Sequence, residues 1–234
     1  MTPEATPREA LYIETGLLDP ETVIKKNRIS MEARIINGDN QTMKQVLKLN
    51  SKDCWIEENK KLKQEIGIKD EDIINTKYHL KNTLQNKIKT NFEKVLRNNA
   101  DNKSKMIYYM EGKQTWKAGN RAKYLSKLTR NQVSTIFKAR TRMLKVKSNY
   151  KNGNKNLNCR LCGTSEETQK HILEECAVLN TEIPTISKEM LFQENPEELK
   201  MVITNIEKRM EKLENQSSNQ SINQPNQPIT TTNQ

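Results

Sequence analysis

The sequence predicts an all-α protein, in which a multi-helix domain carries a small cysteine-rich element and is followed by a disordered C-terminal tail. Only seven glycines and seven prolines occur in 234 residues, and Lys, Glu, Asn and Ile are common, a composition that favours helix. Apolar residues recur at helical spacing, most clearly from Thr76 to Arg97. Prolines at first helical positions follow capping residues, as in Asp19-Pro20 and Asn195-Pro196. Because 33% of residues are hydrophobic and 29% are charged, the core must be modest.

Residues 1–111 are predicted to form a helical domain. The first expected helix ends at the breaker Gly16, and a turn at residues 38–40 separates the second helix from the third. A fourth helix is expected from Ser51 to Gly67, and a fifth covers residues 76–97. The apolar stripe of the fifth helix consists of Leu80, Leu84, Ile88, Phe92, Val95 and Leu96.

The net charge of +11 is concentrated between Gly112 and Ser165, a window that contains no Asp or Glu. Its 14 basic residues give the window a charge of +14, so the rest of the chain is slightly acidic. Such a block predicts binding to a polyanion, above all nucleic acid. A solvated face or an acidic protein partner is the alternative. The basic residues are Lys113, Lys117, Arg121, Lys123, Lys127, Arg130, Lys138, Arg140, Arg142, Lys145, Lys147, Lys151, Lys155 and Arg160.

We interpret residues 112–158 as a basic DNA-binding region. A short helix is expected at Tyr124–Leu128, and Thr129 is a good N-cap for a helix over 130–147. The apolar face of that helix is Val133, Ile136, Phe137 and Leu144, and its polar stripe is Asn131, Thr135, Lys138, Arg142 and Lys145. A short helix, a turn and a basic amphipathic helix are typical of a major-groove reader. The predicted nucleic-acid contacts are Lys117, Arg121, Lys123, Lys127, Arg130, Lys138, Arg142, Lys145 and Lys147.

A candidate metal site lies in residues 159–180, where Cys159, Cys162, His171 and Cys176 have the spacing C-x2-C-x8-H-x4-C. Two thiolates separated by two residues can converge on one ion, and His171 and Cys176 would lie about 1.4 turns apart on an α-helix. Three cysteines and one histidine form a closed tetrahedral set, which predicts a structural zinc with no open position. The alternative is a chance cluster of reduced surface cysteines. A disulfide is a weaker interpretation because three cysteines leave one unpaired.

The C-terminal part is predicted to form a helix within residues 181–215 and a disordered tail over 216–234. The tail has no charged residue and is rich in Asn, Gln, Ser, Pro and Thr. The helix, which begins at Asn195-Pro196, has a continuous apolar face. That face packs either on the body of the protein or on a partner, and the sequence leaves both open. Its residues are Leu199, Val202, Ile203, Ile206, Met210 and Leu213.

No catalytic constellation is recognisable, so we expect the chain not to be an enzyme. The sequence has no D-P-P-W, no Gly-rich phosphate loop and no G-x-S-x-G. The sequence contains no run of 18 apolar residues, so no membrane span is expected. The N-terminus lacks the features of a signal peptide. Few cysteines, grouped as a metal site, favour a reducing compartment, and with the predicted DNA binding we expect a nuclear location.

Most of residues 10–180 resembles the C-terminal region of non-LTR retrotransposon reverse transcriptases. The resemblance rests on the segment 11–18, on the segment 136–147, and on Cys159-x2-Cys162 followed by residues 166–176. In that family the region follows the polymerase thumb and ends in a CCHC zinc motif near bound nucleic acid. The polymerase motif Y-x-D-D is absent here. Since the sequence begins at Met1, we expect a domesticated fragment that kept binding and lost catalysis.

Residues 128–143 are similar to the recognition-helix region of homeodomains, with Gln132, Val133, Phe137 and Arg140 on matching positions. The family's core tryptophan is Ile136 here and its adenine-reading asparagine is Ala139, so 112–158 is homeobox-like but departs at two key positions. A small non-catalytic protein with such an element also resembles the DNA-binding accessory subunits of the ciliate DNA N6-adenine methyltransferase complex.

These observations predict a non-catalytic DNA-binding accessory subunit, with structural zinc as its cofactor. Its expected partners are double-stranded DNA and a catalytic protein such as a methyltransferase. No association with a membrane is expected. Two alternatives remain open at this stage. One is a structural scaffold that holds a catalytic partner, and the other is an RNA-binding remnant of a retrotransposon reverse transcriptase.

Overall fold

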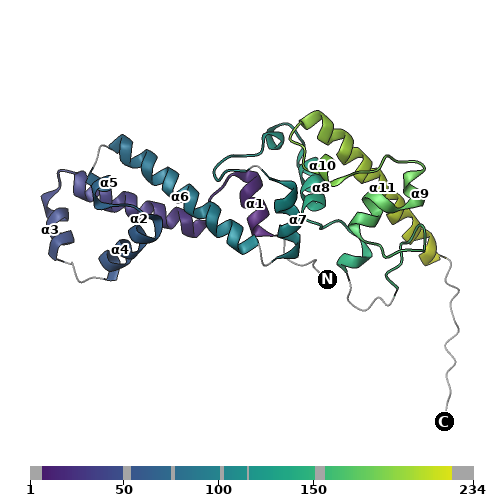
Figure 1. Cartoon of the computed structure of the whole chain (residues 1–234), viewed down its shortest axis with the longest axis horizontal. Coiled ribbons are helices and arrows are strands. Elements are labelled where there is room, and N and C mark those ends of the chain that lie inside the picture. The colour runs from purple at the N-terminus through teal and green to yellow at the C-terminus, as the bar shows by residue number, and fades with distance from the viewer. Residues whose placement is uncertain are drawn as a thin grey trace, which may run out of the picture. The chain divides into compact units, whose positions relative to one another are not determined.

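A computed structural model describes residues 7–49, 54–74, 77–100, 103–114, 116–150 and 156–222. Over these ranges the protein is helical and forms no strand, only an antiparallel bridge between Asn158 and Glu166 (Figure 1). The prediction of an all-α fold is therefore confirmed. None of the helices in the described ranges combines the length and the apolar character that crossing a membrane would require.

The chain forms two compact units whose boundaries differ from the predicted division at residues 111 and 158. The N-terminal unit comprises Arg8–Met110 together with Gln114–Ala122, and the C-terminal unit comprises Glu111–Lys113 and the residues from Lys123 onward. The segment 114–122 belongs to the N-terminal unit because it packs against the end of the first helix. The amide of Ala122 donates to the carbonyl of Glu14 at 2.9 Å, and a Cβ added to Gly16 would meet the backbone of Asn120 and Arg121 at 2.7 Å.

The N-terminal unit is a helical bundle whose first helices begin and end at predicted signals. Asp19 caps the second helix by accepting from the amide of Thr22 at 3.1 Å, and Gly16 and Gly67 adopt positive φ angles after the first and fourth helices. The short helix α5 was not predicted. The elements are α1 (Arg8–Thr15), α2 (Pro20–Asn37), α3 (Gln41–Leu49), α4 (Cys54–Ile66), α5 (Asp70–Ile74), α6 (Lys77–Ala100) and α7 (Ser104–Gly112), which ends in the C-terminal unit.

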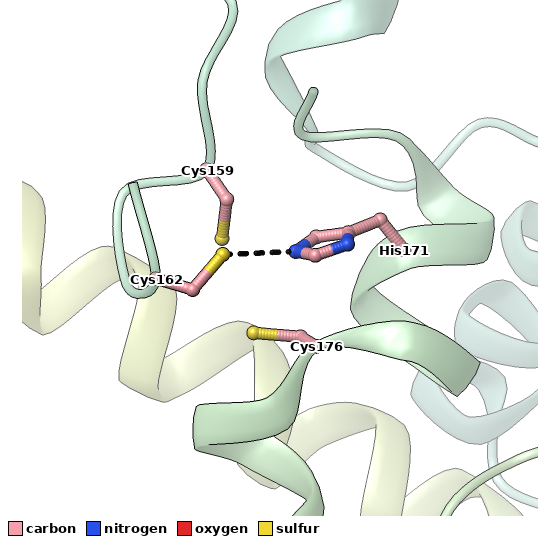
Figure 2. A group of neighbouring side chains, drawn as sticks. All are labelled: Cys159, Cys162, His171 and Cys176. Carbon is pink, nitrogen blue, oxygen red and sulfur yellow. Dashed lines mark hydrogen bonds between the residues drawn. The ribbon is translucent and has the colours of Figure 1, made fainter. Parts of the chain in front are cut away.

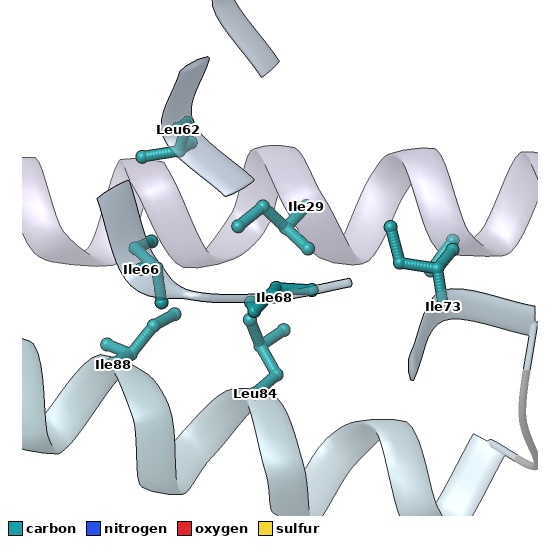
Figure 3. Close-up of a cluster of buried hydrophobic side chains, with 8 residues drawn as sticks. Ile29, Leu62, Ile66, Ile68, Ile73, Leu84 and Ile88 are labelled. Carbon is teal, nitrogen blue, oxygen red and sulfur yellow. The ribbon is translucent and has the colours of Figure 1, made fainter. Parts of the chain in front are cut away.

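The core of the N-terminal unit forms where α2, α4, α5 and α6 meet (Figure 3). Ile29 from α2 and Ile88 from α6 are almost completely buried. A buried polar contact lies beside the core, because Glu32 accepts hydrogen bonds from Asn59 and Lys63 at 3.1 and 2.8 Å. The apolar members of the cluster are Ile29, Ala33, Leu62, Ile66, Ile68, Ile73, Leu84 and Ile88.

The C-terminal unit is organised around its longest helix, α11 (Pro196–Ile222), which packs along α8 (Arg130–Arg140) and α10 (Lys188–Leu191) (Figure 1). The shorter elements are the 3₁₀ turns Lys123–Ser126 and Lys147–Asn149, the π-helix η3 (His171–Glu175) and α9 (Ala177–Asn180). The apolar face of α11 is buried within the unit, which decides between the two alternatives for that face. Its buried residues include Leu199, Val202, Ile203, Ile206 and Leu213.

The end of α11 corrects the predicted start of the disordered tail. The helix continues through Ile222, so residues 216–222, predicted to be disordered, are helical. Gln and Ser have only slightly unfavourable helix propensities, and a helix already anchored by a buried face can extend through them. The rest of the predicted tail, residues 223–234, lies outside the described residues.

The predicted helix over 130–147 is wrong in its length, because α8 ends at Arg140. Arg142 adopts a φ angle of 54°, the amide of Met143 donates to Lys138 O at 2.7 Å, and the amide of Arg142 donates to Ala139 O at 3.3 Å. These two bonds form a Schellman motif, which terminates helices around a residue in left-handed conformation. That residue is usually glycine, so an arginine in its place concealed the end of the helix.

Two arginines, which sequence reasoning did not place in the core, join elements of the C-terminal unit. Arg140 is fully buried, donates to the carbonyls of Leu191 and Gln193 at 2.7 Å each, and stacks over Tyr124 at 4.7 Å. Arg209 is also fully buried and donates to four oxygens, which belong to Ile172, Asn180, Ile183 and Pro184. A guanidinium has five donors, so one side chain can satisfy carbonyls from several loops.

Candidate metal centre and cationic surface

The four predicted metal ligands converge on one point in the C-terminal unit (Figure 2). The ligand atoms of Cys159, Cys162, His171 and Cys176 all lie within 4.8 Å of one another. Cys162 Sγ and His171 Nε2 are 3.3 Å apart. Cys159, His171 and Cys176 are buried and Cys162 is half-buried, so the cluster is largely shielded from solvent.

The first two cysteines are brought together by a tight turn. Gly163 has a φ angle of 70° and its amide donates to Cys159 O at 2.9 Å, which closes the turn directly after Cys162. The amide of Cys159 donates to Ser165 O at 2.7 Å, and the bridge between Asn158 and Glu166 continues this pairing. A residue with a Cβ would be strained at Gly163, because L-residues rarely adopt this conformation.

The other two ligands are aligned by a π-helical turn, where the sequence had suggested an α-helix. The amide of Cys176 donates to His171 O at 2.7 Å, an i→i+5 hydrogen bond that closes η3. The wider turn brings residues five apart onto one side of the helix axis, whereas an α-helix separates them by about 1.4 turns. The x4 spacing between histidine and cysteine is therefore suited to a π-turn, a geometry that is frequent at functional sites.

The protonation of the thiols depends on their different surroundings. Burial raises the pKa of Cys159 to about 11, and the neighbouring Cys176 adds to this effect. Burial also raises the pKa of Cys162, but hydrogen bonds from Thr164, Ser165 and His171 outweigh it and lower that pKa to about 6. A thiolate at Cys162 is the natural first ligand for a cation, and a bound divalent ion would deprotonate the remaining thiols.

A buried ion pair connects the metal centre to the basic segment that precedes it. The side chain of Glu167 is fully buried and receives Arg160 in a bidentate arrangement, at 2.7 and 2.9 Å. Its carboxylate also accepts from the amide of Lys147 at 3.0 Å, and its carbonyl accepts from the amide of Ser148 at 3.2 Å. Glu167 stands among acidic and polar residues in the sequence, yet its side chain is fully buried. It holds residues 147 and 148 against the cysteine turn.

Cys159, Cys162, His171 and Cys176 together can hold a metal ion and are compatible with zinc. Three thiols and one imidazole would occupy all four positions of a tetrahedral ion, so no coordination position stays open for a substrate or an activated water. The chemistry of the donor set therefore suits a structural ion. Arg209 adds support from α11, because its guanidinium donates to Ile172 O inside η3 at 2.6 Å.

The nine predicted nucleic-acid contacts are divided between the two units. Lys117 and Arg121 are exposed in the N-terminal unit, on the segment 114–122. Six others are exposed in the C-terminal unit: Lys123, Lys127, Arg130, Lys138, Arg142 and Lys145. Lys147 is half-buried, and its ammonium group donates to Asn158 O at 2.7 Å.

The exposed face of α8 differs from the predicted polar stripe. Arg142 and Lys145 lie beyond the end of the helix, and Lys145 forms an ion pair with Glu214 of α11 at 3.7 Å. Thr135 donates to Glu207 of α11 at 3.4 Å, so this side of α8 is next to acidic residues. The residues of α8 that are exposed to solvent are Arg130, Asn131, Ser134 and Lys138.

Three cations of the acid-free window serve the fold and have little access to solvent. Arg140 is fully buried, Arg160 pairs with buried Glu167, and Lys113 pairs with Glu194 at 2.6 Å. Part of the window's charge is therefore neutralised or enclosed by residues outside the window, of which Glu194 lies 81 residues from Lys113 and Glu167 lies 7 residues from Arg160. A count of charges within a window could not detect these partners.

The sequence reasoning overlooked a second basic element in the N-terminal unit, helix α6. Glu93 is the acidic residue of α6, and its carboxylate accepts from the amide of Ala118 at 2.6 Å. Arg97 lies over the ring of Trp116 at 5.2 Å, so α6 packs against the segment that carries Lys117. The signal is the high density of lysines in residues 77–97, which accompanies the apolar stripe of the same helix. The basic residues of α6 are Lys77, Lys81, Lys87, Lys89, Lys94 and Arg97.

Comparison of the chain with protein-family models, with curated proteins and with solved structures finds no match. The resemblances to retrotransposon reverse transcriptases, homeodomains and methyltransferase accessory subunits therefore stay predictions.

Proposed function

We propose that this chain is a non-catalytic, zinc-stabilised DNA-binding accessory subunit of a nucleic-acid-modifying complex in the nucleus. One observation carries the proposal. In the stretch 123–138 of the C-terminal unit, four exposed cations have no acidic partner among the described residues. They follow one another from the 3₁₀ turn into the exposed face of α8. These four, the α8 cations, are Lys123, Lys127, Arg130 and Lys138.

The position of these cations suits contact with phosphates. Arg130 is the first residue of α8, where the positive end of the helix dipole already favours an anion, and a cation there weakens the helix slightly. An arginine at that position is therefore better explained by an external anion than by helix stability. With 11 residues α8 is about 16 Å long, and the major groove of DNA admits an α-helix.

The burial pattern favours recognition of the DNA backbone over recognition of bases. Ala139, the position that corresponds to the adenine-reading asparagine of homeodomains, is fully buried, and its carbonyl accepts from Gln169 at 2.6 Å. Ile136, at the position of the family's core tryptophan, is likewise buried. The accessible side of α8 presents cations and short polar groups, which contact phosphates more readily than base edges.

We further propose that the ion is zinc and that the complex is a DNA adenine methyltransferase complex. The ligand set of three thiols and one imidazole supports zinc. The resemblance of the basic element to ciliate accessory subunits supports the methyltransferase. In this scheme the metal centre fixes the position of residues 147 and 148, which follow α8, because Glu167 accepts hydrogen bonds from their amides.

Charge reversal on α8 tests the proposal. Lys138→Glu and Arg130→Glu should each weaken binding to a 30-base-pair duplex by on the order of tenfold, equally for unrelated sequences, because each removes a phosphate contact and adds a repulsion. Fluorescence anisotropy at fixed salt measures the affinities. Lys61→Glu is the matched control, because it makes the same charge change at an exposed position of α4. Unchanged affinity of both α8 variants would refute the proposal.

The same assay separates the alternatives. Preferential binding of a structured RNA in competition with duplex DNA would favour the retrotransposon remnant. The scaffold alternative rested on the apolar face of α11, and that face is buried inside the C-terminal unit. Deleting residues 196–234 would therefore unfold this unit and would not isolate a partner surface.

A further inference from the structure

We propose that the N-terminal unit binds an amphipathic helix of a partner protein, flanked by acidic residues, in an apolar groove between α2, α3 and α4. This inference goes beyond the proposed function, since it assigns the protein partner a place and a chemistry. The groove has a volume of about 230 Å³ and is lined by side chains that are all apolar. The lining residues are Met31, Ile35, Met43, Val46, Leu47, Trp55 and Ile56.

The groove is distinct from the core of the unit because none of its lining residues is buried. Met31 is 52% exposed, Val46 is 44% exposed and Met43 is 39% exposed. Scattered exposed apolar residues are normal on a protein surface, but a continuous apolar lining from three helices marks an interaction site.

The helix α3 has little within the chain to stabilise it. It is nine residues long, and none of the side chains whose burial is described belongs to the core. Isolated helices shorter than about 12 residues are marginal in water, and helices in proteins are stabilised by packing an apolar face. The apolar face of α3, formed by Met43, Val46 and Leu47, points into the groove, so an occupant of the groove would supply the missing packing.

The long helix α2 is apolar on two sides. Ile29 and Ala33 face the core shared with α4, α5 and α6, whereas Met31 and Ile35 line the groove on another side. A helix that is apolar on more than one side is expected to be covered on each of them. The core covers the first side of α2, and among the described residues the second side faces the partly exposed groove residues of α3 and α4.

The charges around the groove select the kind of occupant. Lys44 and Lys48 are the charged residues of α3, and Arg34 lies one position from the groove residue Ile35. Among the described residues of α4 that follow Ile56, Glu57 is exposed, whereas Glu58 pairs with Arg28 at 2.8 Å, and that arginine also donates to the carbonyl of Trp55. Glu32 is buried and pairs with Lys63 at 2.8 Å. A second copy of the chain would bring lysines of α3 close to the same lysines, which is unfavourable. An amphipathic helix with acidic flanks would gain both apolar contacts and ion pairs.

Two synthetic helical peptides of about 18 residues, or five turns, test the proposal with the full zinc-loaded chain. Both carry leucines at i, i+3, i+4 and i+7, and one has glutamates and the other lysines beside this stripe. The glutamate peptide should bind at least about tenfold more tightly in fluorescence anisotropy, a difference that a few peripheral charge pairs can supply. Replacing Lys44 and Lys48 with glutamate should reverse the preference.

The double variant Met43→Ser, Val46→Ser should lose at least about tenfold in affinity for the glutamate peptide, because two apolar anchors are removed. Met201→Ser is the control, since Met201 is 64% exposed on α11 of the C-terminal unit and does not line the groove. Circular dichroism and zinc content check that the variants fold, and unchanged duplex binding separates this result from the proposed function.

Three outcomes would overturn the assignment. Neither peptide binds, both bind equally, or binding survives the double serine variant. A concentration-dependent dimer in sedimentation experiments that disappears in the double serine variant would assign the groove to a second copy of the chain.

Discussion

At the scale of single residues, the charge of a side chain says little about whether it faces solvent. Glu167 lies in a run of acidic and polar residues, yet its side chain is fully buried and paired with Arg160. Arg140 is one of the 14 cations of the acid-free window, yet it is fully buried against backbone carbonyls. Both are stable because every buried charge has partners with suitable geometry, which lowers the cost of desolvation.

The buried ion pair between Glu167 and Arg160 is expected to stabilise the folded chain. Glu167→Gln should lower the free energy of unfolding by about 3 kcal/mol, because it leaves the Arg160 guanidinium without its counter-charge. Urea denaturation measures the loss. Glu175→Gln, which removes an exposed ion pair with Lys170, should change stability by less than about 1 kcal/mol. Equal effects of the two variants would contradict the structural role of Glu167.

The same residue gives the protein a specific sensitivity to acid. Burial raises the pKa of Glu167, but the hydrogen bonds from Arg160 and from the amide of Lys147 outweigh it and hold the pKa below 4.5. A lowered folded-state pKa contributes stability above the unfolded value, and this stability is lost as pH falls through the folded value. The difference between wild type and Glu167→Gln should therefore be constant near neutral pH and shrink below pH 4.5. The substitution leaves the four candidate metal ligands unchanged, so the difference between the two proteins isolates Glu167.

At the scale of elements, the metal centre is formed by two turns. The local sequence explains the first, at Cys159–Gly163, but not the second, the π-turn of η3. The turn at Cys159–Gly163 follows from C-x2-C-G, in which the glycine supplies the left-handed conformation. The π-turn of η3 depends on its surroundings, because Arg209 of α11 donates to Ile172 O within it. The ligand spacing and α11 therefore stabilise the same turn.

Zinc binding is expected to need all four candidate ligands. Cys159→Ser should reduce bound zinc from about one ion per chain to almost none, because a structural zinc site needs all four of its ligands. The thermal midpoint should fall as well, since metal binding stabilises only the folded state. Mass-spectrometric metal analysis and a thermal melt measure the two effects. Cys54→Ser, outside the cluster, should retain the metal, and full zinc content in Cys159→Ser would refute the assigned ligand set.

At the scale of the whole molecule, the positive charge is divided between two units. The N-terminal unit contributes α6 together with Lys117 and Arg121, and the C-terminal unit contributes the α8 cations. In the proposed function, the affinity for a long duplex depends on how many of these cations reach phosphates together.

The salt dependence of binding counts those contacts. If roughly eight phosphates are engaged, the logarithm of the binding constant should fall against the logarithm of salt concentration with a slope of about −7. A titration of duplex binding between low and moderate salt measures the slope. Lys138→Glu should make the slope shallower by about 1, whereas Lys61→Glu should leave it unchanged. A slope near zero in the wild type would contradict phosphate binding.

The sequence by itself determined the features whose signals lie within a few consecutive residues. The helical class, the breaks at Gly16 and Gly67, the cap at Asp19 and the convergence of the four candidate metal ligands were all predicted correctly. Each depends on local geometry: a positive φ angle, a capping oxygen, or a spacing that allows side chains to converge.

Only the tertiary structure decided which polar residues are internal and where helices end against their neighbours. The helix α8 stops at a Schellman motif with Arg142 in place of glycine, and α11 buries its apolar face within its own unit. Burial depends on partners far away in the sequence, as for Arg140, whose guanidinium donates to Leu191 O, 51 residues further along the chain. Burial and charge pairing are properties of packed surfaces, so no short window of sequence contains them.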